Sequence, residues 1–180
     1  MKIYLFLAEG FEEIEAVVPM DIFRRAGIDL VTVSISDELK VSGAHGVNVL
    51  ADKLFSELSF DGEFLVFLPG GMPGTANLDN HAGLKSLISA HASKGKQVAA
   101  ICAAPSILGK MGLLKGREAI CYPGFENLLE AARISEEKVV KSGNIFTAKG
   151  PGVAIPFALK IVEEIKGEKI AADVAAALML

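Results

Sequence analysis

Residues 98–105 read VAAICAAP, an apolar run that leads straight into a cysteine, two small residues and a proline. The apolar run predicts a buried strand, and Pro105 is typical of the first turn of a helix, where its missing N–H costs nothing. Cys102 is therefore expected on a sharp strand-to-helix turn, the arrangement known as a nucleophile elbow. Ala100 and Ala104 are small enough to leave room for such a turn.

Two interpretations of Cys102 follow from this stretch. At the start of a helix, the thiol faces unpaired N–H groups and the positive end of the helix dipole. That position favours the thiolate, the form that attacks electrophiles and oxidants. A lone cysteine in an apolar strand is also commonly an inert core residue. The second cysteine, Cys121, is expected to be such a packed core thiol and not a second reactive one.

Length and composition indicate one globular domain over residues 1–180. The sequence is 51% hydrophobic and 22% charged, which is enough apolar material for a real core. No apolar run reaches the roughly 18 residues of a membrane span, and Met1 leads at once into a short strand, so a cytoplasmic protein without a membrane partner is expected.

The charged residues, cysteines and histidines argue against several other classes of site. A net charge of −4 with interspersed signs gives no basic footprint for nucleic acid. The two cysteines and three scattered histidines have no metal-ligand spacing, so neither a metal site nor a disulfide framework is expected.

Short apolar strands alternate with helical segments along the chain. Strands are predicted at 3–7, 28–35, 64–68, 98–101, 119–122, 138–140 and 145–148, with a hairpin or edge strand pair at 41–50. Helices are predicted from residue 12, at 82–94, from 105 to about 112, at 125–132, from the KGPG segment to Gly167, and in the Ala-rich end. This alternation predicts a mostly parallel sheet with helices on both faces.

The first predicted helix carries a carboxylate within its apolar stripe. At about 100° per residue, Val18, Ile22 and Ala26 lie on one arc, and Glu15 projects into the middle of it. A carboxylate there is costly unless it is protonated or hydrogen-bonded to a specific group. The alternative is that Glu15 only favours the helix dipole near the helix start.

The predicted strand at 64–68 ends in the loop PGGMPG, residues 69–74. The pair Gly70 and Gly71 permits backbone conformations closed to other residues and exposes N–H groups at the carboxyl end of the strand. Open parallel sheets bind ligands at that edge, and such N–H groups can stabilise an oxyanion. The glycines are equally consistent with a simple turn, and their spacing fits no nucleotide loop.

Together these segments resemble the DJ-1/ThiJ/PfpI superfamily, specifically its DJ-1 branch. The resemblance is carried by AEGFEEIE at 8–15, PMD at 19–21 with RRAG at 24–27, LPGG at 68–71, AAICAAP at 99–105 and KGPG at 149–152. It covers essentially the whole chain, and the joint order and spacing of the segments are strong. The resemblance implies a flavodoxin-like three-layer sandwich that forms a homodimer and uses no cofactor.

The resemblance also implies roles for individual residues. Cys102 would be the reactive nucleophile, and Glu15 the carboxyl that hydrogen-bonds its sulfur. The amides of Gly71 and Ala103, with Gly70 beside them, would line an anion pocket. A buried, protonated carboxyl that donates to sulfur would stabilise a thiolate and equally a sulfinate.

Two positions depart from relatives. Ala103 follows Cys102 where the protease branch has a histidine, which argues against a protease. Tyr122 stands before Pro123 where some relatives place a histidine near the thiol, and a phenol is a poor general base at neutral pH. Glu15 is then the evident proton carrier. His45, in the turn of the 41–50 segment, is either solvated or a candidate for the pocket lining, as are Tyr122 and Pro123.

The resemblance implies two classes of function. The first is a stress-protection enzyme in which Cys102 acts on reactive 2-oxoaldehydes such as methylglyoxal, or on glycated substrates, as a glutathione-independent glyoxalase or a deglycase. The alternative is a non-catalytic redox sensor or chaperone in which Cys102 is oxidised to the sulfinate.

Overall fold

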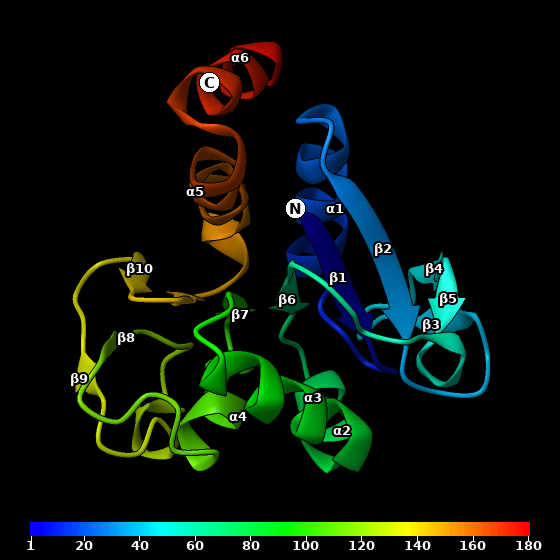
Figure 1. The fold of residues 1–180 in the computed structure, drawn as a ribbon, viewed down its shortest axis with the longest axis vertical. Helices are drawn as coiled ribbons and strands as arrows, with labels where there is room; N and C mark the ends of the chain where they lie inside the picture. Colours follow the sequence, from blue (N-terminus) through cyan, green and yellow to red (C-terminus); the bar gives the residue numbers. More distant parts are fainter.

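A seven-stranded sheet runs through the middle of the computed structural model, which describes residues 1–180 (Figure 1). The strand order is β10-β11-β7-β6-β1-β2-β5. Every neighbouring pair is parallel except β10 and β11, which form an antiparallel hairpin. The prediction of a mostly parallel sheet with small antiparallel additions is confirmed.

The central strands of the sheet are short and buried. The sheet consists of β1 (Lys2–Leu7), β2 (Asp29–Ser34), β5 (Lys53–Leu54), β6 (Phe64–Leu68), β7 (Val98–Ile101), β10 (Val139–Ser142) and β11 (Ile145–Ala148). All residues of β6, β7 and β11 are buried, as expected for strands covered on both faces. Two small separate sheets pair β3 (Lys40–Ser42) with β4 (Asn48–Leu50), and β8 (Glu118–Ala119) with β9 (Arg133–Ile134).

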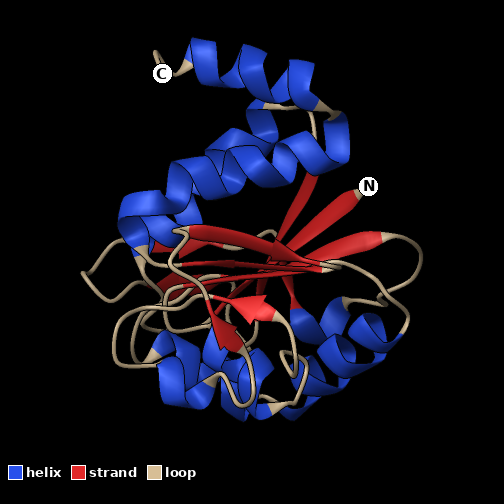
Figure 2. Cartoon of the chain, turned by 90° about the vertical axis from the view of Figure 1, so that its left-hand side faces the viewer, coloured by secondary structure: helices blue, strands red, loops and turns tan.

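Helices cover both faces of the sheet, which gives three layers (Figure 2). One face carries α1 (Glu13–Arg25), α5 (Ala154–Lys166) and α6 (Glu168–Ala177), and the other carries α2 (Gly74–Asn80), α3 (Ala82–Ser93) and α4 (Pro105–Lys110). Short 3-10 turns occur at Phe55–Glu57, Glu126–Leu128 and Pro151–Val153. No helix combines the length and apolarity needed to cross a bilayer.

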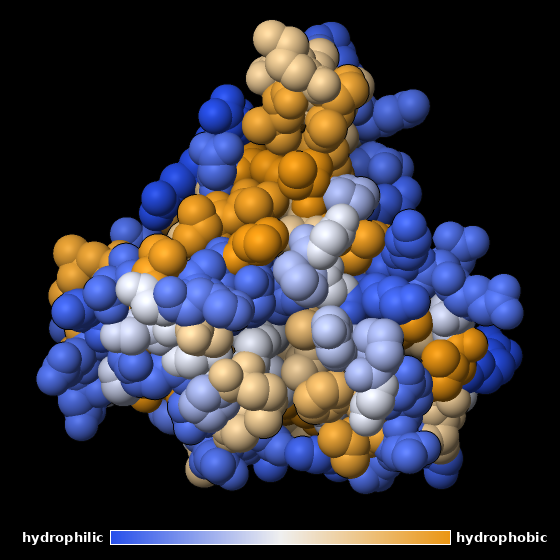
Figure 3. Space-filling view, turned by 180° about the vertical axis from the view of Figure 1, so that it is seen from behind, coloured by the Kyte–Doolittle hydropathy of each residue, from blue (hydrophilic) through white to orange (hydrophobic).

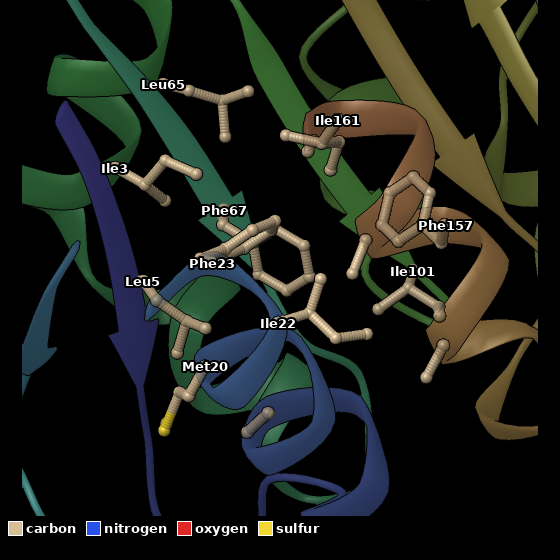
Figure 4. Close-up of a cluster of buried hydrophobic side chains, with 14 of the residues drawn as sticks. Ile3, Leu5, Met20, Ile22, Phe23, Leu65, Phe67, Ile101, Phe157 and Ile161 are labelled. Atoms are coloured by element: carbon tan, nitrogen blue, oxygen red, sulfur yellow. The ribbon is translucent and has the colours of Figure 1, made fainter. Parts of the chain in front are cut away.

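Each face of the sheet has its own apolar core, because successive strand residues point to opposite sides. Figure 4 shows part of the first core, in which side chains of β1, β6 and β7 meet α1 and α5: Ile3, Leu5, Leu65, Phe67, Ile101, Met20, Ile22, Phe23, Phe157 and Ile161. The second core packs the alternate residues of the same strands against α2, α3 and α4. The two cores fix the carboxyl ends of β1, β6 and β7 beside one another.

The segment between α4 and β10 differs from its prediction. The strand expected at 119–122 is only β8, because Ile120 N–H donates to Thr147 Oγ1 and Tyr122 N–H donates to the carbonyl of Cys102. The helix expected at 125–132 is only the 3-10 turn at Glu126–Leu128. The strand is lost because Ile120 and Tyr122 bond to β11 and the elbow, whereas the helix is reduced to one turn because Leu128 and Leu129 N–H donate to carbonyls only three residues back.

Candidate active site

Cys102 lies on the turn between β7 and α4. Its φ is +65°, a left-handed backbone conformation that residues other than glycine rarely adopt. Its N–H donates to the carbonyl of Ala148 at 2.9 Å, and its own carbonyl accepts from Tyr122 N–H at 2.7 Å. Such strain costs on the order of 1–3 kcal/mol and clusters at functional sites. The turn leaves Cys102 8% exposed, at the surface of the core and not deep within it.

The glycine loop after β6 approaches the elbow closely. Gly70 N–H donates to Glu15 Oε2 at 2.9 Å, and the carbonyl of Gly70 accepts from Glu12 N–H at the same distance. Gly71 has a φ of +89°, and a Cβ there would come within 2.3 Å of Glu12 N. Both contacts require the backbone of the loop to lie directly against the start of α1.

Glu15 is completely buried beside the cysteine. A Cβ added to Gly70 would lie 2.6 Å from Glu15 Oε2 and 2.7 Å from Cys102 Cβ, so the two side chains border the same point. The second oxygen, Oε1, is buried and makes no hydrogen bond of ordinary geometry. The side chain of Glu15, from the apolar face of α1, and the side chain of Cys102, at the end of β7, therefore lie side by side, with Gly70 between them.

The environment shifts the pKa of both groups. Burial raises the pKa of Glu15 to about 7, although the Cys102 thiol and the Gly70 amide lower it. Burial raises the pKa of Cys102 to about 12; the charge of Glu15 and its hydrogen bond add to this, and the amides of Gly71 and Ala103 lower it. Because a charge on one group opposes a charge on the other, the pair holds a single negative charge near neutral pH.

We expect that charge to lie on the sulfur. The sulfur has two backbone donors, the amides of Gly71 and Ala103, whereas the carboxyl has one, the amide of Gly70. A carboxylate with an unpartnered oxygen in a fully buried site is costly. A proton on Oε1 of Glu15 removes that cost and provides a donor for the Cys102 thiolate.

The structure brings Cys102, Glu15, Gly70, Gly71 and Ala103 together and places the other candidates around them. Tyr122 and Pro123 line a surface pocket of about 400 Å³ that is also bordered by Lys138 and residues 149–153. The thiol itself is not part of that lining. Cys121 is buried, and burial raises its pKa to about 11, in line with a packed thiol.

His45 is held by Glu13 and not by the cysteine. Its Nδ1 lies 2.9 Å from Glu13 Oε2, and its backbone N–H donates to Glu13 Oε1 at 2.6 Å. Its side chain is 73% exposed. None of its hydrogen bonds reaches Cys102 or Glu15. With Glu12 these two residues place three ligand-type atoms within 4.8 Å of one another, but Glu12 already caps α1 and the other two pair together.

Glu13 is a structural anchor that the sequence did not indicate. Its carboxylate accepts hydrogen bonds from His45 and from Val47 N–H, and so fixes the β3–β4 hairpin over the start of α1. Burial raises its pKa, but the hydrogen bonds of His45 and Val47 outweigh this and leave the pKa below its ordinary value. Its partners lie more than thirty residues away in the sequence, so helix periodicity carries no signal for it.

Replacing Gly70 with alanine should destabilise the protein by about 2 kcal/mol, because the added methyl group overlaps Glu15 Oε2 and Cys102 Cβ. Gly152 is the matched control: it has no atom within 4 Å of its would-be Cβ and does not have a positive φ. Gly152→Ala should change the free energy of unfolding by no more than about 0.5 kcal/mol. Urea unfolding measures both, and equal effects would contradict the described packing.

The chain is similar to known proteins over nearly its whole length. A model of the DJ-1/PfpI family matches residues 1–164. Protein DJ-1 homolog B of Arabidopsis thaliana is 36% identical over 99% of this chain. The chain spans 41% of that relative's length, less than half of it. Glutathione-independent glyoxalase DJR-1.2 of Caenorhabditis elegans is 31% identical over 88% of this chain and 85% of its own length.

Solved structures show the same fold. The structure described as Toxoplasma gondii DJ-1, oxidized, superposes with a TM-score of 0.92 at 39% identity, covering 99% of this chain and 97% of that one. The flavodoxin-like sandwich expected from the sequence is thereby confirmed. The family match, the shared fold and the shared sequence agree, and the chain belongs to the DJ-1/PfpI family, in its DJ-1 branch.

Proposed function

We propose that this protein is a cysteine-dependent, glutathione-independent glyoxalase that protects against small 2-oxoaldehydes such as methylglyoxal. The observation that carries the proposal is the buried Glu15 carboxyl directly beside the Cys102 side chain. A nucleophile and a proton carrier in contact are what addition to an aldehyde requires. The glyoxalase name of the Caenorhabditis elegans relative supports the same reaction.

In the first step, the Cys102 sulfur attacks the aldehyde carbon. A C–S bond forms, the carbonyl π electrons move to the oxygen, and that oxygen takes the proton of Glu15. The product is a hemithioacetal, and Glu15 is left ionised. The amides of Gly71 and Ala103, which lie against the sulfur, are placed to stabilise the developing oxyanion.

In the second step, Glu15 moves the proton that isomerises the adduct. Its carboxylate takes the hydrogen of the former aldehyde carbon as a proton, and the electron pair forms an enediolate in which the neighbouring carbonyl oxygen carries the negative charge. Glu15 returns the proton to that neighbouring carbon, and the hydroxyl proton on the former aldehyde carbon moves to the enediolate oxygen, which gives the thioester of a 2-hydroxy acid. One substrate carbon is oxidised and the other reduced, so no external oxidant is needed, and water then cleaves the thioester and frees the thiol.

Glu15 serves as both acid and base in this scheme. Tyr122 stands where a histidine would otherwise assist, and its backbone N–H, which donates to the carbonyl of Cys102, supports the turn. A pKa of Glu15 raised to about 7 is well suited to both roles near neutral pH. Release of aldehydes from glycated groups, a deglycase-like activity, would involve the same hemithioacetal.

Lactate formation from methylglyoxal without glutathione tests the proposal. Purified protein should produce lactate at a rate proportional to protein concentration, and Cys121→Ser should keep the activity because Cys121 is a packed thiol. Lactate production no faster than in buffer alone would overturn the proposal.

A second candidate function is redox sensing by Cys102. The two amides at the sulfur are donors for sulfinate oxygens, and the unpartnered Oε1 of Glu15 is a further donor when the carboxyl is protonated. The related Toxoplasma gondii structure is described as oxidized. In this role the thiolate is oxidised by two peroxide molecules in turn, and each delivers one oxygen and leaves as water.

At low peroxide, Cys102 should gain two oxygens before Cys121 does, because Cys121 is buried and its pKa is raised without a proton-sharing partner. Glu15→Leu should slow sulfinate formation several-fold, since the donor for the sulfinate is lost. Peptide mass spectrometry over a peroxide series measures both sites. Oxidation of Cys121 first would rule out selective sensing.

We further propose that the protein is a homodimer. A band of apolar side chains lies on the surface of the layer formed by α1, α5 and α6 (Figure 3). Ile14, Val17 and Leu180 are exposed apolar residues on or directly after these helices, and Ile14 and Leu180 line one groove together with residues of α5. Light scattering should give twice the 19.0 kDa chain mass, and Ile14→Glu should halve that value. A monomeric native protein would contradict the proposal.

A further inference from the structure

The pocket lined by Tyr122, Pro123, Lys138 and residues 149–153 is not used by the reaction scheme above. Its volume of about 400 Å³ lies in the range of small-molecule sites. It contains the KGPG segment at 149–152, a motif whose chemical role the sequence leaves open. The walls are partly apolar, and the ring of Tyr122 lies over Gly150, 3.1 Å from where a Cβ would be.

Both walls of this pocket are tied to the backbone of Cys102. Cys102 N–H donates to the carbonyl of Ala148, the residue before Lys149, and the carbonyl of Cys102 accepts from Tyr122 N–H. The wall at residues 149–153 therefore follows the residue that accepts a hydrogen bond from Cys102, and the wall at Tyr122 begins at the residue that donates one to it. The pocket is thus built on the two segments that hydrogen-bond to the elbow, although the thiol itself is not in its lining.

The pocket is positively charged within an acidic protein. Lys138 and Lys149 are its two charged lining residues, and neither forms a salt bridge with a carboxylate. Lys149 N–H donates to the carbonyl of Lys138 at 3.0 Å, which keeps the two residues side by side. The net charge of the chain is −4, so this pair of cations is a local feature and not a general excess.

We propose that the carbonyl substrate of Cys102 carries an anionic group, a carboxylate or a phosphate, that binds Lys138 and Lys149. This inference rests on the proposed function and names its substrate class. The cations hold the anion, the proline and tyrosine side chains cover the carbon chain, and the carbonyl end reaches the elbow. Hydrogen bonds between charged partners are stronger than those between neutral ones, which makes the two lysines specificity-determining residues.

Three 2-oxoaldehydes test the substrate class: methylglyoxal, which is neutral, 4,5-dioxopentanoate, which carries a carboxylate, and hydroxypyruvaldehyde phosphate. The wild-type protein should have a kcat/KM at least about tenfold higher for one of the anionic aldehydes than for methylglyoxal. Whichever of the two anionic aldehydes has the larger kcat/KM shows whether the substrate carries a carboxylate or a phosphate. The preference should shrink at high ionic strength, because both lysines are exposed.

The double variant Lys138→Gln/Lys149→Gln should lose that preference, mainly through a higher KM, and should process methylglyoxal within about twofold of the wild-type rate. Lys115→Gln is the matched control, because Lys115 is also exposed and unpaired but lies outside the pocket. An equal loss of kcat/KM for neutral and anionic aldehydes, or the absence of a preference for an anionic aldehyde in the wild-type protein, would overturn the inference.

Anion binding without turnover separates this inference from the proposed function. Inorganic phosphate should shift the amide NMR signals of Gly150 and Gly152 in the wild-type protein and in Cys102→Ser, but not in the double lysine variant. Lysine-dependent phosphate binding without any lactate formation would support the anion site and contradict the proposed glyoxalase activity. Glyoxalase activity with no lysine-dependent phosphate binding would support the proposed enzyme activity and overturn the anion site.

Discussion

Cys102→Ser should abolish lactate formation from methylglyoxal, with kcat/KM falling by at least about a thousandfold. A hydroxyl keeps the size of the side chain but is a far weaker nucleophile than a thiolate, and the scheme has no other group that forms the bond to carbon. The assay is lactate production by matched concentrations of wild-type and variant protein.

The control for this variant is its stability. Serine tolerates the left-handed turn at position 102 about as well as cysteine, so the urea midpoint should change little. Cys121→Ser should keep its activity in the same assay. Substantial lactate formation by a folded Cys102→Ser protein would rule out the covalent mechanism.

Glu15→Gln should reduce kcat for methylglyoxal by about a hundredfold to a thousandfold while leaving Cys102 reactive toward iodoacetamide. The amide of glutamine accepts from Gly70 N–H and donates to the sulfur, so it replaces the neutral carboxyl in every respect except proton transfer. Glu15→Leu should lose both turnover and thiol reactivity. A Gln variant that turns over normally would show that Glu15 only positions the sulfur.

The same glutamate should make the stability of the protein depend on pH. In the folded protein the Glu15–Cys102 pair loses its first proton near pH 7, whereas an ordinary carboxyl loses its proton near pH 4.5. Between these values the folded state binds the proton that the unfolded state releases, so stability is full below pH 4.5 and decreases as pH rises to 7. The loss is on the order of 3 kcal/mol, and it should be absent in Glu15→Gln. Urea unfolding at several pH values measures it.

Much of the site is local in the sequence, which is why it could be predicted. The buried run before Cys102 and the proline after it define the elbow, and the angular position of Glu15 on α1 places its carboxyl in the apolar face. Gly70 and Gly71 follow a strand with five buried residues. Each of these features depends on a few neighbouring residues and on one regular period.

The parts that were missed depend on contacts between distant segments. His45 binds Glu13 because the β3–β4 hairpin folds back on the start of α1, and no period in the sequence specifies that contact. The predicted strand at 119–122 gives up its regular pairing because Tyr122 bonds to Cys102. Helix α2 follows the glycine loop directly and is only seven residues long, too short for an apolar stripe to show.

Ultraviolet titration of the thiolate in a Cys121→Ser background tests the central claim most directly. If Glu15 holds the shared proton and Cys102 the charge, thiolate absorbance should appear with a midpoint near pH 7, where the pair loses its first proton. Glu15→Leu should move that midpoint to higher pH. A wild-type midpoint near pH 12 would show that Glu15 ionises while the thiol keeps its proton, and would contradict the account.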